Sequence, residues 1–275
     1  MTDFPINQTV EAAGPVAVEI RNPAGQISVS TAPGITASKV QIAPADEQNR
    51  SRHAAQNTTV TASPDGSSLS IEVPERFGRV GSVNLTVVVP DGSSVEAKTA
   101  SADISIDGTL ARVTAATASG DVWIGDVGDD ATVRTASGDV TVRGVAGTTS
   151  VTTASGDISL GAAAGHAGLS TASGDIRAES VAAGMRARTA SGDITVRSAS
   201  GGRVEAQTVS GDVAIAVPRG IVAWLDLSAL TGSVRSDLDD GATAPPAGGG
   251  LELAARTVSG DIRISRAAAT LGGAA

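Results

Sequence analysis

The sequence contains no cysteine and no tyrosine, and only two Phe, two Trp and two Met among its 275 residues. Without cysteine the chain has neither disulfide bonds nor thiolate metal sites. Aromatic side chains usually supply the bulk that fills an irregular protein interior. Since they are nearly absent, the core must be built from Val, Ala, Ile and Leu, which favours many small and similar layers.

An excess of positive charge is also missing, since 20 Lys and Arg stand against 29 Asp and Glu, giving a net charge of −9. A phosphate backbone needs a basic surface, so nucleic acid is not expected as a partner. The N-terminus, residues 1–5, has no signal-peptide pattern, and no stretch reaches the roughly 18 apolar residues of a membrane-spanning helix. The sequence therefore predicts no membrane-spanning segment and a cytoplasmic location, with the cell surface, reached by an unrecognised route, as the alternative.

What the sequence does contain is a strict repeat that carries the tag Thr-Ala-Ser-Gly-Asp in most copies. The aspartates of six copies lie 18 residues apart, at Asp103, Asp121, Asp139, Asp157, Asp175 and Asp193. Further copies end at Asp212 and Asp261, and residues 231–234 resemble a degraded copy. A fixed period of this kind is typical of stacked units, each of which buries its apolar side only against its neighbours.

Within one repeat, Val140, Val142, Val145 and Val151 follow two runs of alternating pattern. Alternation bounded by Gly-containing turns predicts strands rather than helices. A triangular coil of three hexapeptides would place Arg134 and Arg188 at inward corners, where unpaired guanidinium groups are too costly. The sequence therefore predicts an all-β fold, a parallel β-solenoid of flattened 18-residue coils, with two short strands in each coil and irregular capping strands at both ends.

Four regions are expected along the chain. Residues 1–96 form an N-terminal cap of irregular coils, with strands near residues 16–20, 27–29, 40–42, 69–73 and 83–87 and a polar loop over residues 43–57. Residues 97–217 form the regular solenoid. Residues 218–266 form irregular coils, with a strand near 221–227 and a Gly/Pro/Ala linker at 239–250. Residues 267–275 are expected to form a disordered tail.

The tag itself has two interpretations. In the first, a glycine such as Gly138 precedes the aspartate of each tagged copy except the first, where Ala102 stands, because the corner needs a positive φ. Asp and Ser then hydrogen-bond the turn amides, so the tag only sets the register. In the second, coils about 4.8 Å apart stack the carboxylates into a ladder that attracts cations. Calcium-binding β-rolls also use 18 residues per turn, but carry aspartate at both corners, whereas this chain carries it at one. No cofactor is therefore expected, and calcium is the one weak alternative, with ladder candidates at Asp121, Asp139, Asp157, Asp175 and Asp193.

Catalytic patterns are scarce. His53 and His166 lie alone in expected loops, and the repeated carboxylates are equivalent to one another, whereas an acid/base pair requires two different environments. We therefore predict that the chain is not an enzyme. Trp123 occupies an outward position where other coils carry Thr or Arg177, and with Arg143 and Arg177 it is a candidate contact for a protein partner.

The tag, with its 18-residue spacing, resembles a bacterial putative-adhesin family of β-strand repeats, a domain of unknown function. The resemblance covers most of the chain. It implies a parallel β-solenoid and a role in adhesion or cell-envelope stress, and supplies no site residues. We therefore expect a non-enzymatic scaffold or adhesin-like protein-interaction module, the alternative being a calcium-dependent or carbohydrate-binding adhesin. An enzyme related to pectin-processing β-helices is disfavoured, because such enzymes need aromatic sugar platforms.

Overall fold

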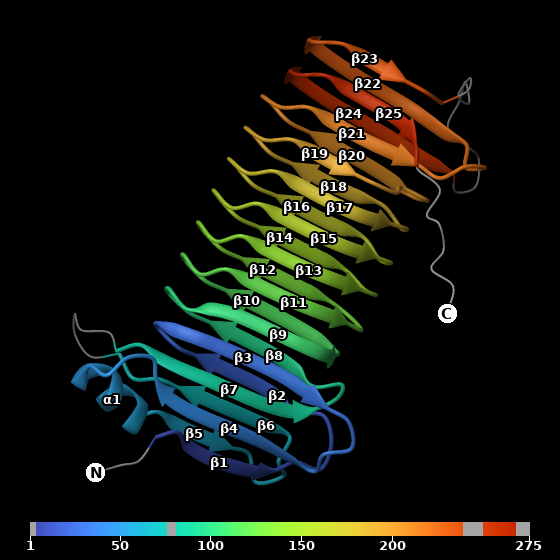
Figure 1. The fold of residues 1–275 in the computed structure, drawn as a ribbon. Helices are drawn as coiled ribbons and strands as arrows, with labels where there is room; N and C mark the ends of the chain where they lie inside the picture. Colours follow the sequence, from blue (N-terminus) through green and yellow to red (C-terminus); the bar gives the residue numbers. More distant parts are fainter. Residues whose placement is uncertain (1–3, 76–80, 239–249, 268–275) are drawn as a thin grey trace. The chain divides into compact units, whose positions relative to one another are not determined.

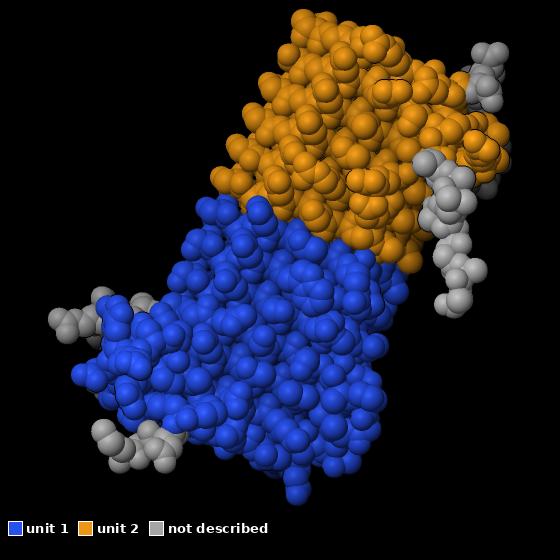
Figure 2. Space-filling model, viewed as in Figure 1, with its two compact units in different colours: residues 1–146 blue, residues 147–275 orange. Residues whose placement is uncertain are grey.

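The computed structural model describes residues 4–75, 81–238 and 250–267, and they fold almost entirely into β-strands (Figure 1). The chain divides into two compact units, residues 1–146 and 147–275 (Figure 2). Each unit contains strands of two sheets, and neighbouring strands of the regular coils are parallel. The predicted all-β parallel solenoid is therefore confirmed.

In the first unit, one sheet has the order β1-β4-β7-β3-β9-β11-β13 and the other has the order β12-β10-β8-β2-β6-β5. The strands and the helix have these bounds: β1 Ile6–Glu11, β2 Ala17–Arg21, β3 Gly25–Ala32, β4 Ala37–Pro44, α1 Asn49–Gln56, β5 Thr59–Ala62, β6 Ser68–Glu72, β7 Val83–Pro90, β8 Ser94–Lys98, β9 Asp103–Leu110, β10 Arg112–Ala116, β11 Val122–Val127, β12 Ala131–Arg134 and β13 Val140–Val145. The five strands predicted in the N-terminal region are all present.

In the second unit, the orders are β15-β17-β19-β21-β25-β23 and β22-β24-β20-β18-β16-β14. The bounds are β14 Thr149–Thr152, β15 Ile158–Ala163, β16 Ala167–Ser170, β17 Ile176–Val181, β18 Met185–Arg188, β19 Ile194–Val196, β20 Arg203–Gln207, β21 Val213–Val217, β22 Ala223–Thr231, β23 Val234–Ser236, β24 Leu251–Ser259 and β25 Ile262–Arg266. The strand predicted near residues 221–227 corresponds to β22.

Each regular coil contributes one strand to each sheet, as β11 and β12 show. On β11, Val122, Ile124 and Val127 are buried, while Trp123 and Asp126 are exposed. The inward residues stack in register with the next coil, for example Ile124 against Val142. This alternation builds the core as ladders of aliphatic side chains between the sheets. Arg134 and Arg188 are exposed, as the flattened coil requires.

The first coil in the sequence is not the outermost coil of the first unit. Strand β2 lies between β6 and β8, and β3 lies between β7 and β9. Antiparallel strands then end both sheets, since β4 pairs with β7, β1 with β4, and β5 with β6. Segments distant in the sequence, such as residues 17–21 and 94–98, thereby become hydrogen-bonded neighbours.

The predicted polar loop at residues 43–57 is wrong in part, because Asn49–Gln56 forms helix α1. Ser51, Ala54 and Ala55 are buried, and they share one face of the helix at helical spacing. The Ser51 hydroxyl accepts a hydrogen bond from the Ser82 N–H at 3.1 Å. Only three small residues form the buried face, so the apolar pattern was too weak to predict a helix.

In the second unit, the last coil in the sequence lies between two earlier coils. Strand β24 lies between β20 and β22, and β25 lies between β21 and β23, so that β22 and β23 are the outermost strands of the second unit. The predicted linker at 239–250, apart from Gly250, and the predicted tail, apart from Ala267, lie outside the described residues. The boundaries at 96, 217 and 266 stay predictions.

Candidate functional site

The tag forms one corner of each coil, and its side chains bond to the backbone. In the first unit, the Thr135 Oγ1 accepts a hydrogen bond from the Gly138 N–H at 3.1 Å. The Asp121 Oδ1 accepts one from the Asp139 N–H in the next coil at 2.9 Å. Thr135 is 9% exposed, so its hydroxyl satisfies an amide that would otherwise be buried without a partner.

The same ladder of hydrogen bonds runs through the second unit. The Asp N–H donates to the Oδ1 of the preceding aspartate at 2.7 to 2.9 Å, in the pairs Asp175–Asp157, Asp193–Asp175, Asp212–Asp193 and Asp261–Asp212. At its end, Asp261 accepts from the Ser233 N–H at 2.8 Å. That backbone bond, with the Ser233 side chain, lowers the pKa of Asp261. One carboxylate oxygen of each of these rungs therefore sets the register between coils.

The glycine of the tag is required for a different reason from the one predicted. The φ angles of Gly120, Gly138, Gly174 and Gly192 lie outside the left-handed region. A Cβ on Gly138 would instead lie 1.9 Å from the carbonyl oxygen of Gly120 in the preceding coil. The prediction of a positive φ is thus wrong at these four corners, because close approach of two backbones selects glycine there, whereas Gly211 and Gly260 do have positive φ angles of 157° and 149°.

Binding of cations to the aspartate ladder stays a prediction. Arg177 lies against this ladder, with its Nη2 2.6 Å from Asp175 Oδ2 and its Nη1 3.5 Å from Asp157 Oδ2. A guanidinium group thus bridges these two rungs from the protein itself. Among the described residues, no three acidic or histidine side chains lie close enough together to hold a metal ion.

A second candidate surface lies on the outer face of β11 and β13, and we call Trp123, Arg143 and Asp126 the Trp123 surface. The Trp123 side chain is 37% exposed, between Ser105 on β9 and Thr141 on β13. Arg143 donates to Asp126 through Nε at 3.1 Å and Nη2 at 2.5 Å. This bidentate pair holds the guanidinium in place and raises the pKa of Arg143. Trp123 and Arg143 therefore share one face in the first unit, whereas Arg177 belongs to the second unit.

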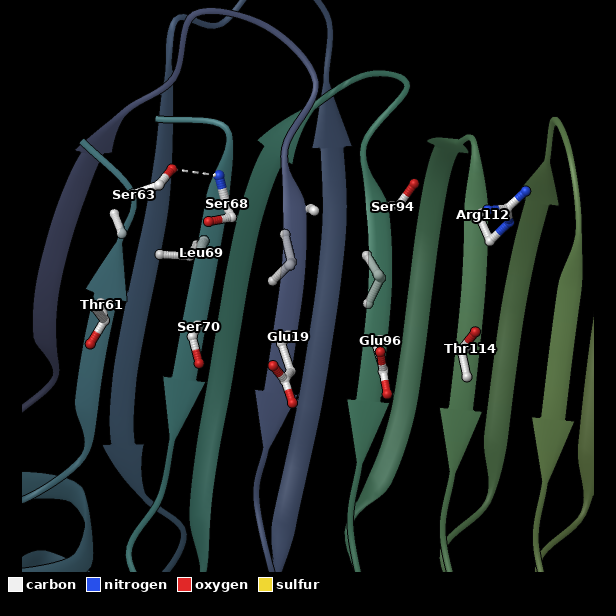
Figure 3. Close-up of a pocket in the computed structure, with 14 residues that line it drawn as sticks. Glu19, Thr61, Ser63, Ser68, Leu69, Ser70, Ser94, Glu96, Arg112 and Thr114 are labelled. Atoms are coloured by element: carbon white, nitrogen blue, oxygen red, sulfur yellow. Dashed lines mark hydrogen bonds between the residues drawn. The ribbon is translucent and has the colours of Figure 1, made fainter. Parts of the chain in front are cut away.

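A shallow groove of about 520 Å³ crosses the outer face of the other sheet of the first unit (Figure 3). It contains a row of side chains in register on five neighbouring strands, which we call the hydroxyl–carboxylate row: Thr61, Ser70, Glu19, Glu96 and Thr114. Glu19 accepts from Arg21 at 2.8 Å, and Glu96 is ion-paired with Lys98. Such a row offers hydrogen bonds to a polyhydroxylated or cationic ligand.

Sequence reasoning missed the hydroxyl–carboxylate row. Glu19 and Glu96 are distant in the sequence, and they become neighbours only because β2 is inserted between β6 and β8. One signal was present, because Glu19 lies between two apolar residues of the strand predicted at residues 16–20 and so had to face outward. Glu96 also lies between two apolar residues, Val95 and Ala97, but no strand was predicted there.

Among the ion pairs of the described residues, the least exposed carboxylate is that of Glu205 in the second unit, whose side chain is 12% exposed. Its Oε2 accepts from Arg186 Nε and Nη2 at 3.0 and 2.8 Å, and its Oε1 accepts from Gln207 Nε2 at 2.7 Å. The hydrogen bond from Arg186 lowers the pKa of Glu205, with attraction from Arg186, Arg188 and Arg203 adding to the effect.

We expect the substitution Glu205→Gln to lower the free energy of unfolding at neutral pH by about 0.5 to 1 kcal/mol, the scale of a partly solvated ion pair. Because the folded pKa is depressed, this stabilisation is present above the ordinary value of 4.5 and is lost as the pH falls through the lower folded pKa. Urea denaturation at neutral pH and at about pH 3 measures the difference. The matched control is Glu179→Gln, since Glu179 is 59% exposed in its pair with Arg197. If the wild type and Glu205→Gln differed in free energy of unfolding by the same amount at both pH values, the prediction would be contradicted.

Stacked parallel coils with a repeated structural corner define the chain as a parallel β-solenoid repeat protein. It belongs to the Toastrack DUF4097 family, whose model matches residues 26–265, and this confirms the resemblance to a domain of unknown function.

Two solved structures share the fold over nearly their whole length. One is a putative adhesin from Bacteroides fragilis, 13% identical, with a TM-score of 0.50 and coverage of 96% of this chain and 98% of that chain. The other is a putative lipid binding protein from Parabacteroides distasonis, 14% identical, with a TM-score of 0.54 and coverage of 94% and 96%. The comparison with curated proteins found no match. No helix in the described part of the chain is long and apolar enough to span a membrane.

Proposed function

We propose that the chain is a non-enzymatic, adhesin-like module that binds a protein partner through the Trp123 surface. The observation that carries the proposal is the 37% exposure of Trp123 on a sheet face whose neighbouring outward residues are hydroxyl-bearing or ion-paired. Tryptophan and arginine are enriched among the residues that dominate binding energy at protein interfaces. A rigid sheet holds them in place, so little conformational entropy is lost on binding.

Two further features favour a binding role over a catalytic one. The threonines and aspartates of the tag bond to the backbone and so serve the architecture. The charged groups of the Trp123 surface and of the hydroxyl–carboxylate row form ion pairs with near neighbours. Of the two locations expected from the sequence, association with the cell surface is favoured by the solved structure described as an adhesin.

The experiment compares proteins captured by the immobilised full chain and by Trp123→Ser from bacterial extracts, with each captured protein then purified and titrated. We expect the true partner to bind Trp123→Ser at least about 30-fold more weakly, as at an interface hot spot. The matched control is Val209→Ser, which removes another exposed apolar side chain, 51% exposed, from the second unit.

A parallel titration against glycans, with calcium and with a chelator, tests the alternative adhesin functions. Glycan binding lost in Trp123→Ser, or dependent on calcium, would favour the carbohydrate or the calcium-dependent alternative. The proposal fails if every purified partner binds Trp123→Ser and the wild type equally.

A further inference from the structure

The second unit ends in an edge that its described residues leave uncovered. Strand β22 is the last strand of one sheet, beyond β24, and β23 is the last strand of the other, beyond β25 (Figure 1). In residues 147–238 and 250–267, no strand pairs with the outer side of β22, which is nine residues long. Its outward-directed backbone groups are therefore a template for another strand.

The inward side chains of β22 are also incompletely covered. On the neighbouring β24, Leu253 and Ala255 are fully buried. Their register partners on β22, Leu225 and Leu227, are only partly buried. The aliphatic ladder of the core therefore continues to the surface at this edge.

An exposed apolar stripe leads to the same edge. The second position of the tag is alanine in the regular coils, but Val209, Val258 and Leu230 occupy it in the last three coils. They are 51%, 45% and 78% exposed, and they line a shallow groove with Arg188 and Arg256. Exposure of the stripe is greatest at Leu230, on the edge strand itself.

This edge lacks the features that usually protect one. Edge strands that are protected against pairing with another chain are short, or contain proline or unpaired charged residues. Strand β22 contains no proline, and its one charged residue, Asp226, is 3.0 Å from Arg256 on β24.

We propose that β22 pairs antiparallel with β22 of a second copy of this chain, about a two-fold axis at Leu227. On the inner side, Leu227 then faces Leu227 of the second copy, and Leu225 faces Ala229. On the outer side, Trp224 faces Leu230, and Asp226 faces Ser228. The most exposed apolar residue thereby meets a tryptophan, and no like charges oppose each other.

The two neighbouring registers of this β22–β22 pair bring less favourable side chains opposite each other. With the axis at Asp226, the two Asp226 carboxylates face each other. With the axis at Ser228, Asp226 faces Leu230, and Trp224 faces Gly232. A strand such as β5 of another copy has four residues and would cover less than half of β22. Self-pairing uses all nine residues and closes the assembly at two copies.

The first test is sedimentation velocity and light scattering of the wild-type chain, where we expect a concentration-dependent dimer. Because the chain has no cysteine, Leu227→Cys adds a single thiol on the axis. Directly opposed residues of an antiparallel pair lie about 4.5 to 5.5 Å apart between Cα atoms, within the reach of a disulfide. We expect Leu227→Cys to form a disulfide-linked dimer on oxidation. The control Leu225→Cys should not, since the register separates its two thiols by roughly 13 Å along the strand.

The second test uses charge at the exposed Ser228. In the proposed register, Ser228→Asp places a carboxylate opposite Asp226 of the second copy, twice per dimer, and should weaken the dimer roughly 5- to 30-fold. Ser228→Lys should leave the dimer unchanged or strengthen it. Circular dichroism and melting confirm that each variant folds. A monomeric wild type, cross-linking at Leu225→Cys but not at Leu227→Cys, or the same effect from both Ser228 variants would overturn the proposal.

Discussion

Gly138→Ala is expected to destabilise the first unit by more than about 2 kcal/mol, at the upper end of single-substitution effects. The added Cβ would lie 1.9 Å from the Gly120 carbonyl oxygen and 2.6 Å from its carbon. Both atoms belong to the backbone, so the two coils must separate at this corner. That separation would also disturb the hydrogen bonds from Gly138 to Thr135 and from Asp139 to Asp121. The midpoint of urea denaturation measures the loss.

The matched control is Gly128→Ala. A Cβ on Gly128 would meet its nearest atom, the Leu110 carbonyl oxygen, at 3.5 Å, which is ordinary van der Waals contact. Gly128 is exposed and its φ lies outside the left-handed region, so the expected change is within about 0.5 kcal/mol. If the two variants lost similar stability, close backbone approach would not be the reason for glycine in the tag.

Ile124→Ala is expected to cost about 2 to 5 kcal/mol, the range for removing a large buried aliphatic side chain. Ile124 is fully buried, and it stacks between Ile106 and Val142 in the aliphatic ladder. Stacked coils are close-packed above and below, so the cavity cannot readily collapse. Chemical denaturation measures the cost.

Thr141→Ala provides the control for this substitution. Thr141 lies on the adjacent strand but faces outward and is exposed, so we expect a change within about 0.5 kcal/mol. Comparable losses from Ile124→Ala and Thr141→Ala would contradict the alternation of buried and exposed residues on which the fold depends.

The glycine of the tag shows how far sequence reasoning reached into the corner. Its recurrence indicated a position that favours glycine, and the close backbone contact at Gly138 agrees with this, although Ala102 occupies the position in the first tagged copy. The reason was wrong, because an 18-residue period does not reveal how closely two stacked backbones approach. That distance depends on the packing of Gly138 against Gly120 in the preceding coil.

Of the candidate surfaces, too, the sequence predicted one and missed another. Alternation alone predicted that Trp123 faces outward, and the side chain is 37% exposed. The hydroxyl–carboxylate row was missed, because it depends on strands that are not consecutive in the chain. Arg177 as a partner contact stays a prediction; in the structure its guanidinium donates to Asp175, two residues earlier in the chain.

By itself, the sequence determined the coil: its length, its two strands, its aliphatic core and its one structural corner. These features follow from local periodicity, because side chains alternate along a strand and identical coils stack on one another. Only the tertiary structure decided the order of the coils at the ends, where β2 and β3, and then β24 and β25, are inserted between strands that are not their neighbours in the sequence. Strand pairing across such separations depends on backbone hydrogen bonds that any residues of the right pattern can make, so the pattern does not specify which strand pairs with which.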